Sequence, residues 1–127
     1  MNFISFIMNN KIIFLIIIMF LIHLINPIEK MTQSKYKGKK VIIYNFNTSW
    51  CYYSKILMPV WKKLEKHYKN NKYVKVIDVK CEEKQNKKIC KKYKIKSYPT
   101  IIKVKDGKKI MFKGNRTVKD LIKFIES

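Results

Sequence analysis

The stretch Trp50-Cys51-Tyr52-Tyr53-Ser54 lies between an apolar run and an amphipathic run of the sequence. Residues 41–46 are almost continuously apolar, which is typical of a strand buried on both faces. From residue 54 to about residue 69, apolar side chains recur at helical spacing, and lysines occupy the other side. Pro59 is expected to bend this helix without ending it. The pattern therefore places Cys51 where a buried strand passes into a helix.

A cysteine in this position is expected to ionise readily. The N-terminus of a helix carries about half a positive charge and free N–H groups, and both favour a thiolate over a thiol. An ordinary thiol, with a pKa near 8.5, is only about 3% ionised at pH 7. We therefore expect Cys51 to be a nucleophile, and the alternative is a small buried side chain. Three residues further on, Ser54 offers a hydroxyl and no thiol.

The rest of the sequence predicts a short α/β domain. Alternating residues 73–79 indicate a second strand, and residues 82–93 indicate a short helix with acids at its start and lysines at its end. Asp106-Gly107 between two apolar runs is a strong hairpin signal. Thr117 can cap a last amphipathic helix. The predicted order is β-α-β-α-β-β-α.

Taken together, these motifs resemble those of the thioredoxin superfamily over residues 39–127. Trp50-Cys51-x-x-Ser54 is similar to the family's Trp-Cys-x-x-Cys, and Tyr98-Pro99-Thr100 is similar to its cis-proline turn. The segment from Cys81 to Pro99 looks most like the protein disulfide isomerase branch. The resemblance implies a thioredoxin-like fold, in which helices flank a central mixed four-stranded sheet. A hydrophobic N-terminal helix, a transmembrane segment or signal anchor, is expected to precede it.

The resemblance also implies roles for individual residues. Cys51 would attack a disulfide with Trp50, Ser54 and Pro99 around it, and the alternative for Pro99 is an ordinary proline at the start of a strand. Cys81 and Cys90 would form a structural disulfide in an oxidising compartment; the alternatives are two buried thiols or, after a large motion, a Cys90 that resolves Cys51. Substrate-binding roles fall to three tyrosines: Tyr52, Tyr53 and Tyr98.

Two departures from the family pattern define the expected activity. Ser54 replaces the second cysteine and cannot release a mixed disulfide, although its hydroxyl can donate to the Cys51 thiolate. Asn45 stands where these families often place a buried acid, and an amide cannot accept a proton. We expect monothiol disulfide exchange or isomerisation, with no bound cofactor and with glutathione or another thiol as co-substrate. The alternative is a non-catalytic module that holds peptides beside Pro99.

Two other kinds of site are not expected. His67 follows Cys51 by sixteen residues on the same predicted helix, about 24 Å along its axis, which is too far for a Cys–His dyad. The sequence has no Cys-x-x-Cys or His-x-x-x-His pair, so we expect no metal site.

The N-terminal part of the chain has a different composition. We expect an anchor or signal segment at residues 1–28, a basic linker at 29–38 and the thioredoxin-like domain at 39–127. Residues 12–25 are apolar except for His23, which favours an uncleaved single-pass membrane anchor. The alternatives are a cleaved signal, giving a secreted or lumenal protein, and a buried helix.

The net charge of +21 raises the question of nucleic-acid binding. Of the 29 lysines and arginines, only Arg116 is an arginine, and arginine is the preferred residue for bidentate base and phosphate contacts. The lysines are also spread along every segment. The sequence therefore predicts no specific nucleic-acid partner, but protein or peptide thiols and disulfides as partners, and a membrane contacted through the N-terminal segment.

Overall fold

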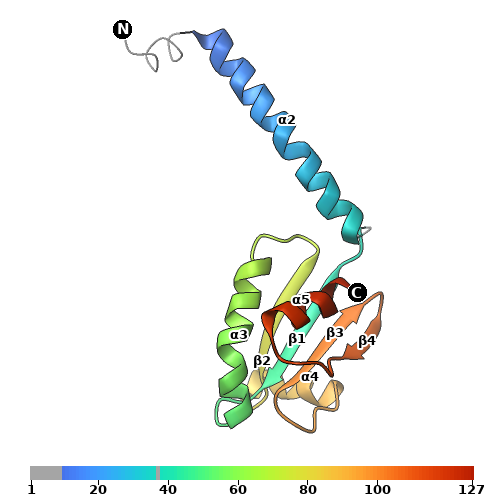
Figure 1. The fold of residues 1–127 in the computed structure, drawn as a ribbon. Helices are drawn as coiled ribbons and strands as arrows, with labels where there is room; N and C mark the ends of the chain where they lie inside the picture. The colour runs from blue at the N-terminus through green and yellow to red at the C-terminus, as the bar shows by residue number, and fades with distance from the viewer. Residues whose placement is uncertain (1–9, 37) are drawn as a thin grey trace. The chain divides into compact units, whose positions relative to one another are not determined.

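The computed structural model describes residues 10–36 and 38–127, and within the first of these ranges the side chains of 10–24. The chain divides into two units, Met1–Lys37 and Gly38–Ser127, and each is considered by itself. In the first unit, α2 (Lys11–Tyr36) is one helix that includes most of the predicted linker (Figure 1). Residues 1–9 of the predicted anchor and residue 37 of the linker lie outside the described residues.

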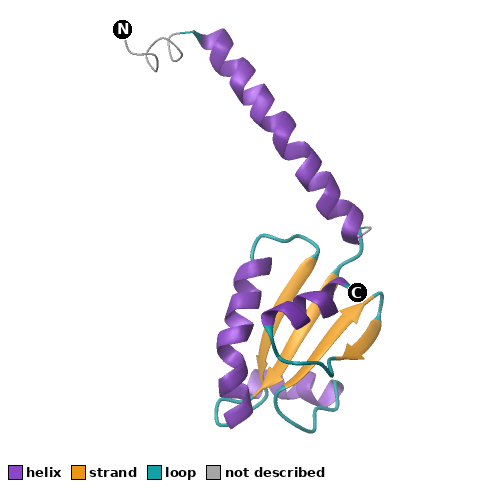
Figure 2. Ribbon diagram, in the orientation of Figure 1, coloured by secondary structure: helices purple, strands orange, loops and turns teal. Residues whose placement is uncertain are grey.

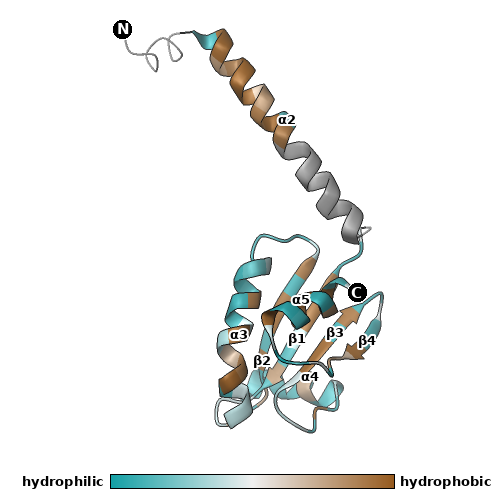
Figure 3. Cartoon of the chain, in the orientation of Figure 1, coloured by the Kyte–Doolittle hydropathy of each residue, from teal (hydrophilic) through white to brown (hydrophobic). Residues whose placement is uncertain are grey.

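The described side chains of α2 are mostly apolar. Figure 3 colours this part of the helix mainly as hydrophobic residues, and most of its large apolar side chains between Ile12 and Leu24 are exposed. Among the described residues, no helix meets the length and hydrophobicity that a bilayer span requires.

The second unit is built on a mixed four-stranded sheet, as predicted. Its strand order is β2-β1-β3-β4, with β1 parallel to β2 and antiparallel to β3, and β3 antiparallel to β4. The helices follow the predicted order along the chain. The elements are β1 (Val41–Asn47), α3 (Tyr52–Tyr68), β2 (Val74–Lys80), η1 (Lys84–Asn86), α4 (Lys87–Lys92), β3 (Thr100–Lys105), β4 (Lys108–Met111) and α5 (Val118–Glu126).

Helices cover both faces of the sheet. In Figure 2, α3 and α5 lie on the face toward the viewer and α4 lies behind the strands. Tyr44 and Phe46 of β1 face α4, because their ring centroids lie 5.3 and 5.0 Å from that of Tyr93 at its end. Since side chains alternate along a strand, Asn45 and Asn47 face α3 and α5. This second face also buries the apolar side chains Leu57, Trp61, Leu64, Leu121 and Ile125.

Two local features follow directly from the residues that form them. Asp106 and Gly107 both have positive φ, 52° and 72°, which is the backbone that a two-residue hairpin turn requires and that Asp-Gly adopts readily. Pro59 lies inside α3 without ending the helix. Strand β1 ends at Asn47, so the loop that follows it carries Cys51 to one end of the sheet.

Candidate active site

Cys51 lies at the start of α3 and faces the turn that contains Pro99. Cys51 is the N-cap residue of α3. The helix itself begins at Tyr52, two residues earlier than the sequence predicts. The Cys51 thiol donates a hydrogen bond to the carbonyl oxygen of Tyr98 at 3.4 Å. The Tyr98–Pro99 peptide bond is cis. Residues 47 positions apart in the chain therefore meet at one end of the sheet.

The surroundings of the sulfur favour its ionised form. The pKa of Cys51 lies below that of an ordinary thiol, chiefly because the backbone N–H of Ser54 donates to the sulfur. The Ser54 hydroxyl, the backbone N–H of Tyr53 and the charge of Arg116 act in the same direction, while partial desolvation opposes them. Cys51 is partly exposed and is the free cysteine of the structure, since the other two are bonded to each other. A nucleophile that a substrate can reach requires this combination.

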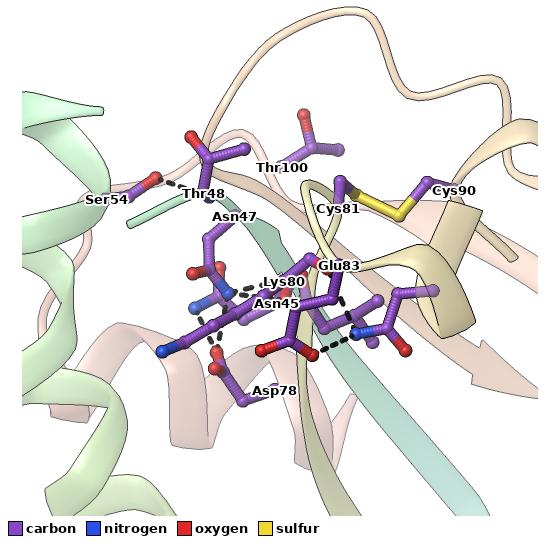
Figure 4. Close-up of a disulfide and its surroundings, with 12 residues drawn as sticks. Asn45, Asn47, Thr48, Ser54, Asp78, Lys80, Cys81, Glu83, Cys90 and Thr100 are labelled. Carbon is purple, nitrogen blue, oxygen red and sulfur yellow. Dashed lines mark hydrogen bonds between the residues drawn. A yellow bond between two sulfur atoms is a disulfide. The ribbon is translucent and has the colours of Figure 1, made fainter. Parts of the chain in front are cut away.

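Ser54 lies beneath the thiol and is 1% exposed. The backbone N–H of Thr48 lies 3.5 Å from the Ser54 hydroxyl oxygen, which accepts from it (Figure 4). This bond leaves the hydroxyl proton free to donate to the Cys51 thiolate. Ser54 therefore favours the ionised form of the Cys51 sulfur and offers no second sulfur to it.

Three exposed aromatic residues lie next to Cys51 in the sequence. Trp50, Tyr52 and Tyr53 are 68%, 69% and 61% exposed, although large aromatic residues are usually buried in good part. The Trp50 ring meets the Tyr98 ring edge to face, with centroids 6.0 Å apart. The predicted substrate-binding residues thus border Cys51 from both sides, on the first turn of α3 and on the cis-proline turn.

A carboxylate lies close to Asn45, and sequence reasoning missed it. Asp78 of β2 pairs with Asn45 in the parallel register, and its Oδ1 accepts from Asn45 Nδ2 at 2.9 Å and from Asn47 Nδ2 at 2.7 Å (Figure 4). Desolvation by burial raises the pKa of Asp78 above its ordinary value. The position of the family's buried acid is an amide here, but the neighbouring strand places a carboxylate beside it.

Cys81 and Cys90 form a disulfide. Both are nearly buried, in the cluster between β1, β2 and α4. The Cys81 N–H donates to Asn47 O at 2.8 Å, and the neighbouring Glu82 accepts from the Ser49 N–H at 2.6 Å. Cys81 and Glu82 therefore support the end of β1 and the middle of the segment that leads from it to Cys51. Sequence reasoning missed the contribution of Glu82.

Arg116, the single arginine, lies at the same end of the sheet. Its Nη2 donates to Pro99 O at 3.3 Å, so it contacts the turn that faces the thiol. The sequence singled out this residue only for its rarity, because a position just before the last helix gives no signal that the side chain reaches the cis-proline turn.

A thiol at a strand-to-helix junction, facing a cis-proline turn across a mixed sheet, defines the thioredoxin-like class of proteins. The sequence model of the family described as Thioredoxin matches residues 28–127. The chain belongs to that family.

Within the family, the chain is similar to protein disulfide isomerases. It is 31% identical over 101 residues to a probable protein disulfide-isomerase A6 of Medicago sativa, covering 78% of this chain and 27% of that protein. It is 36% identical over 92 residues to protein disulfide-isomerase A4 of Bos taurus, covering 69% of this chain and 14% of that protein. The crystal structure of human ERp44 superposes with a TM-score of 0.61 at 26% identity, and the match covers 77% of this chain and 31% of the ERp44 chain. The chain thus spans less than a third of the length of each of these relatives.

Proposed function

We propose that this chain carries out thiol–disulfide exchange through Cys51 alone, isomerising the disulfides of client proteins or retaining clients as mixed disulfides. The observation that carries the proposal is the contact between Cys51 Sγ and Tyr98 O at 3.4 Å, across the cis-proline turn. It places a thiol of lowered pKa beside a backbone carbonyl at which an extended peptide could pair.

The reaction is a displacement at sulfur. The Cys51 thiolate attacks one sulfur of a client disulfide, a new disulfide forms between Cys51 and the client, and the other client sulfur leaves as a thiolate that takes a proton from water. A client thiolate can then attack the mixed disulfide, which restores Cys51 and leaves the client with a different pairing. Neither step changes the total number of disulfides, so isomerisation needs no added oxidant or reductant.

The second step depends on a thiol from outside the site. Ser54 lies where a second cysteine would stand, and its hydroxyl cannot form a disulfide. Cys81 and Cys90 are bonded to each other. Until a client thiol, glutathione or another thiol arrives, the mixed disulfide should persist.

The experiment that tests this proposal uses a client protein with scrambled disulfides. The wild-type chain should restore native pairing in a redox-buffered solution, and Cys51→Ser should not. Quenching the reaction with acid should trap a covalent complex of wild-type chain and client that reductant dissolves. A wild-type chain that neither restores pairing nor forms this complex would contradict the proposal.

The rival function is a non-catalytic peptide-binding module, and the exposed aromatic residues favour it. Trp50, Tyr52 and Tyr53 offer apolar contact area beside Tyr98 whether or not the thiol reacts. Binding of a cysteine-free peptide separates the two functions. If binding survives both reductant and Cys51→Ser but is lost in a Trp50→Ala variant, and no isomerisation is measured, the rival is correct.

We also propose that residues 1–28 hold the domain at a membrane, on the oxidising side. The apolar run at residues 12–25 supports the tether. The disulfide between Cys81 and Cys90 supports an oxidising compartment, because disulfides are rare where thiols are kept reduced. Resistance to extraction by alkaline carbonate, with protection from added protease in sealed vesicles, is the expected result. A soluble protein whose N-terminal sequence begins after residue 28 would instead show a cleaved signal.

A further inference from the structure

A hollow with a cationic wall lies next to the cis-proline turn. Its volume is about 460 Å³, and its lining includes Pro99, Phe112, Lys113, Asn115 and Arg116. The residues that line it, all within the described domain, include two cations and no acid. A hollow of this kind beside a reactive thiol is suited to a negatively charged part of a substrate.

A hydrogen bond connects the Arg116 guanidinium to the turn that faces the thiol. Arg116 Nη2 donates to Pro99 O at 3.3 Å, and the residue before Pro99 accepts from Cys51 Sγ at 3.4 Å. Two hydrogen bonds to the carbonyls of the adjacent residues Tyr98 and Pro99 therefore connect the sulfur and the guanidinium. The charge of Arg116 also contributes to the lowered pKa of Cys51, which agrees with this proximity.

The guanidinium retains donors for a ligand. Arginine has five N–H donors in a planar fork, and the bond to Pro99 occupies one of them. The fork matches a carboxylate in a bidentate pair, which is stronger and more directional than a pair with lysine. Lys113 and Asn115 are exposed on the same short segment and line the same hollow.

We propose that this hollow is a subsite for a carboxylate carried by the disulfide substrate, with Arg116 as the main contact and Lys113 as a second one. The inference rests on the proposed exchange reaction and names the substrate class for it: disulfides with an acidic group close to the reacting sulfur. The carboxylate can come from an acidic side chain of a client peptide or from glutathione.

The experiment uses pairs of short peptides activated as 2-pyridyl disulfides, with either Glu or Gln at one position beside the single cysteine. The Cys51 thiolate attacks the peptide sulfur, a Cys51–peptide disulfide forms, and the released pyridine-2-thione is followed by its absorbance. The ratio of the two rate constants is the measured quantity. A variant that changes the ionised fraction of Cys51 changes the rate constants of both peptides by the same factor. The ratio of the two rate constants therefore reports the subsite alone.

The wild-type chain should react about two- to fivefold faster with the Glu peptide, the effect of a partly exposed ion pair near the surface. Arg116→Gln should bring the ratio close to one, and Lys113→Gln should lower it by a smaller factor. The matched control is Lys75→Gln, which removes a cation from a separate hollow lined by residues of the opposite end of β1 and β2. This control should leave the ratio unchanged.

A second arm separates the two sources of the carboxylate. Pyridyl disulfides of glutathione and of its diethyl ester replace the peptides. If glutathione is a source, its rate should exceed that of the ester in the wild-type chain and not in Arg116→Gln. If glutathione and its ester react equally while the peptide ratio holds, the acidic side chain of a client is the ligand.

The inference is overturned if no substrate pair differs in the wild-type chain, if Arg116→Gln keeps the ratio, or if Lys75→Gln lowers it as much. The last two results would assign the preference to the overall positive charge. These failures differ from failure of the proposed function, in which the wild-type chain would release no thione from any of these disulfides.

Discussion

The carbonyl oxygen of Tyr98 accepts a hydrogen bond from the Cys51 thiol at 3.4 Å. A thiolate has no proton to donate, so this bond exists only while the sulfur is protonated. Ionisation breaks it and leaves the Tyr98 carbonyl free to accept from the backbone N–H of an extended substrate. The step that makes the sulfur nucleophilic therefore also opens the site at which a substrate backbone can pair.

Ser54→Cys tests why the mixed disulfide should persist. A thiol at this position can attack the Cys51–client disulfide within the same molecule, so we expect adduct lifetimes to fall by at least about tenfold, given the high effective concentration of a neighbouring group. Stopped-flow or quenched mass measurement of a glutathione adduct checks this result. Ser54→Ala is the control and should leave the adduct as long-lived as in the wild-type chain.

The alkylation rate of Cys51 should depend on pH in a defined way. Because the pKa of the thiol is lowered, the rate should rise with pH, and its midpoint should lie below the pKa of an ordinary thiol. Arg116→Gln and Ser54→Ala should each move the midpoint toward higher pH, since each removes a group that stabilises the thiolate. Iodoacetamide labelling across the pH range measures the midpoint. A midpoint at or above the pKa of an ordinary thiol, about 8.5, in the wild-type chain would contradict the site described.

Asp78→Asn should stabilise the domain near neutral pH. The folded state raises the pKa of Asp78 through desolvation, so the wild-type domain loses stability as the pH rises from the unfolded value, near 3.8, through the folded value. An amide oxygen can still accept from Asn45 and Asn47, and it has no charge to bury. We expect a gain of no more than about 1 kcal/mol at neutral pH for this half-buried position.

Urea unfolding at several pH values measures the effect of Asp78→Asn. The difference between variant and wild type should increase from pH 4 toward neutral pH. A wild-type domain that gains stability relative to the variant over this range would show that the carboxylate is favoured in the fold.

Removal of the disulfide should weaken the domain without removing the thiol. Cys81 and Cys90 are nine positions apart, and closing a loop of about this length stabilises a fold by roughly 2–3 kcal/mol. The double variant Cys81→Ser, Cys90→Ser should lose about this much free energy of unfolding. Reductant should lower the stability of the wild-type domain by a similar amount and leave the variant unchanged. An equal response of both proteins to reductant would show that the disulfide is absent in solution.

Much of the fold could be predicted from local sequence patterns. The apolar run 41–46, the Asp106-Gly107 turn and the helical spacing after Cys51 each report on a few adjacent residues, and the structure confirms the order of elements that they predict. The linker differs, because α2 continues to Tyr36 through most of the predicted basic linker at residues 29–38. The helix can continue because residues 29–36 contain no glycine. It ends at Tyr36, before Gly38, whose φ is +71°.

The features that escaped prediction, in the site and in the core, depend on contacts between distant elements. Asp78 meets Asn45 only through the parallel register of β1 and β2, and a single acid in an alternating strand gives no sign of this. Lys103 is 2% exposed, although a lysine within a strand suggests a solvated face. Its Nζ donates to Phe124 O at 2.6 Å and to Ser127 Oγ at 2.9 Å at the end of α5, which depends on tertiary packing.

The most direct test of Cys51 as the reacting thiol is the intact mass of the chain after incubation with glutathione disulfide at pH 7. We expect one added glutathione, located on Cys51 by peptide mapping, that remains after the excess reagent is removed and disappears when a thiol is added. Cys51→Ser should gain no mass. A wild-type chain that stays unmodified, or that carries its adduct on Cys81 or Cys90, would contradict the claim that Cys51 is the reacting thiol.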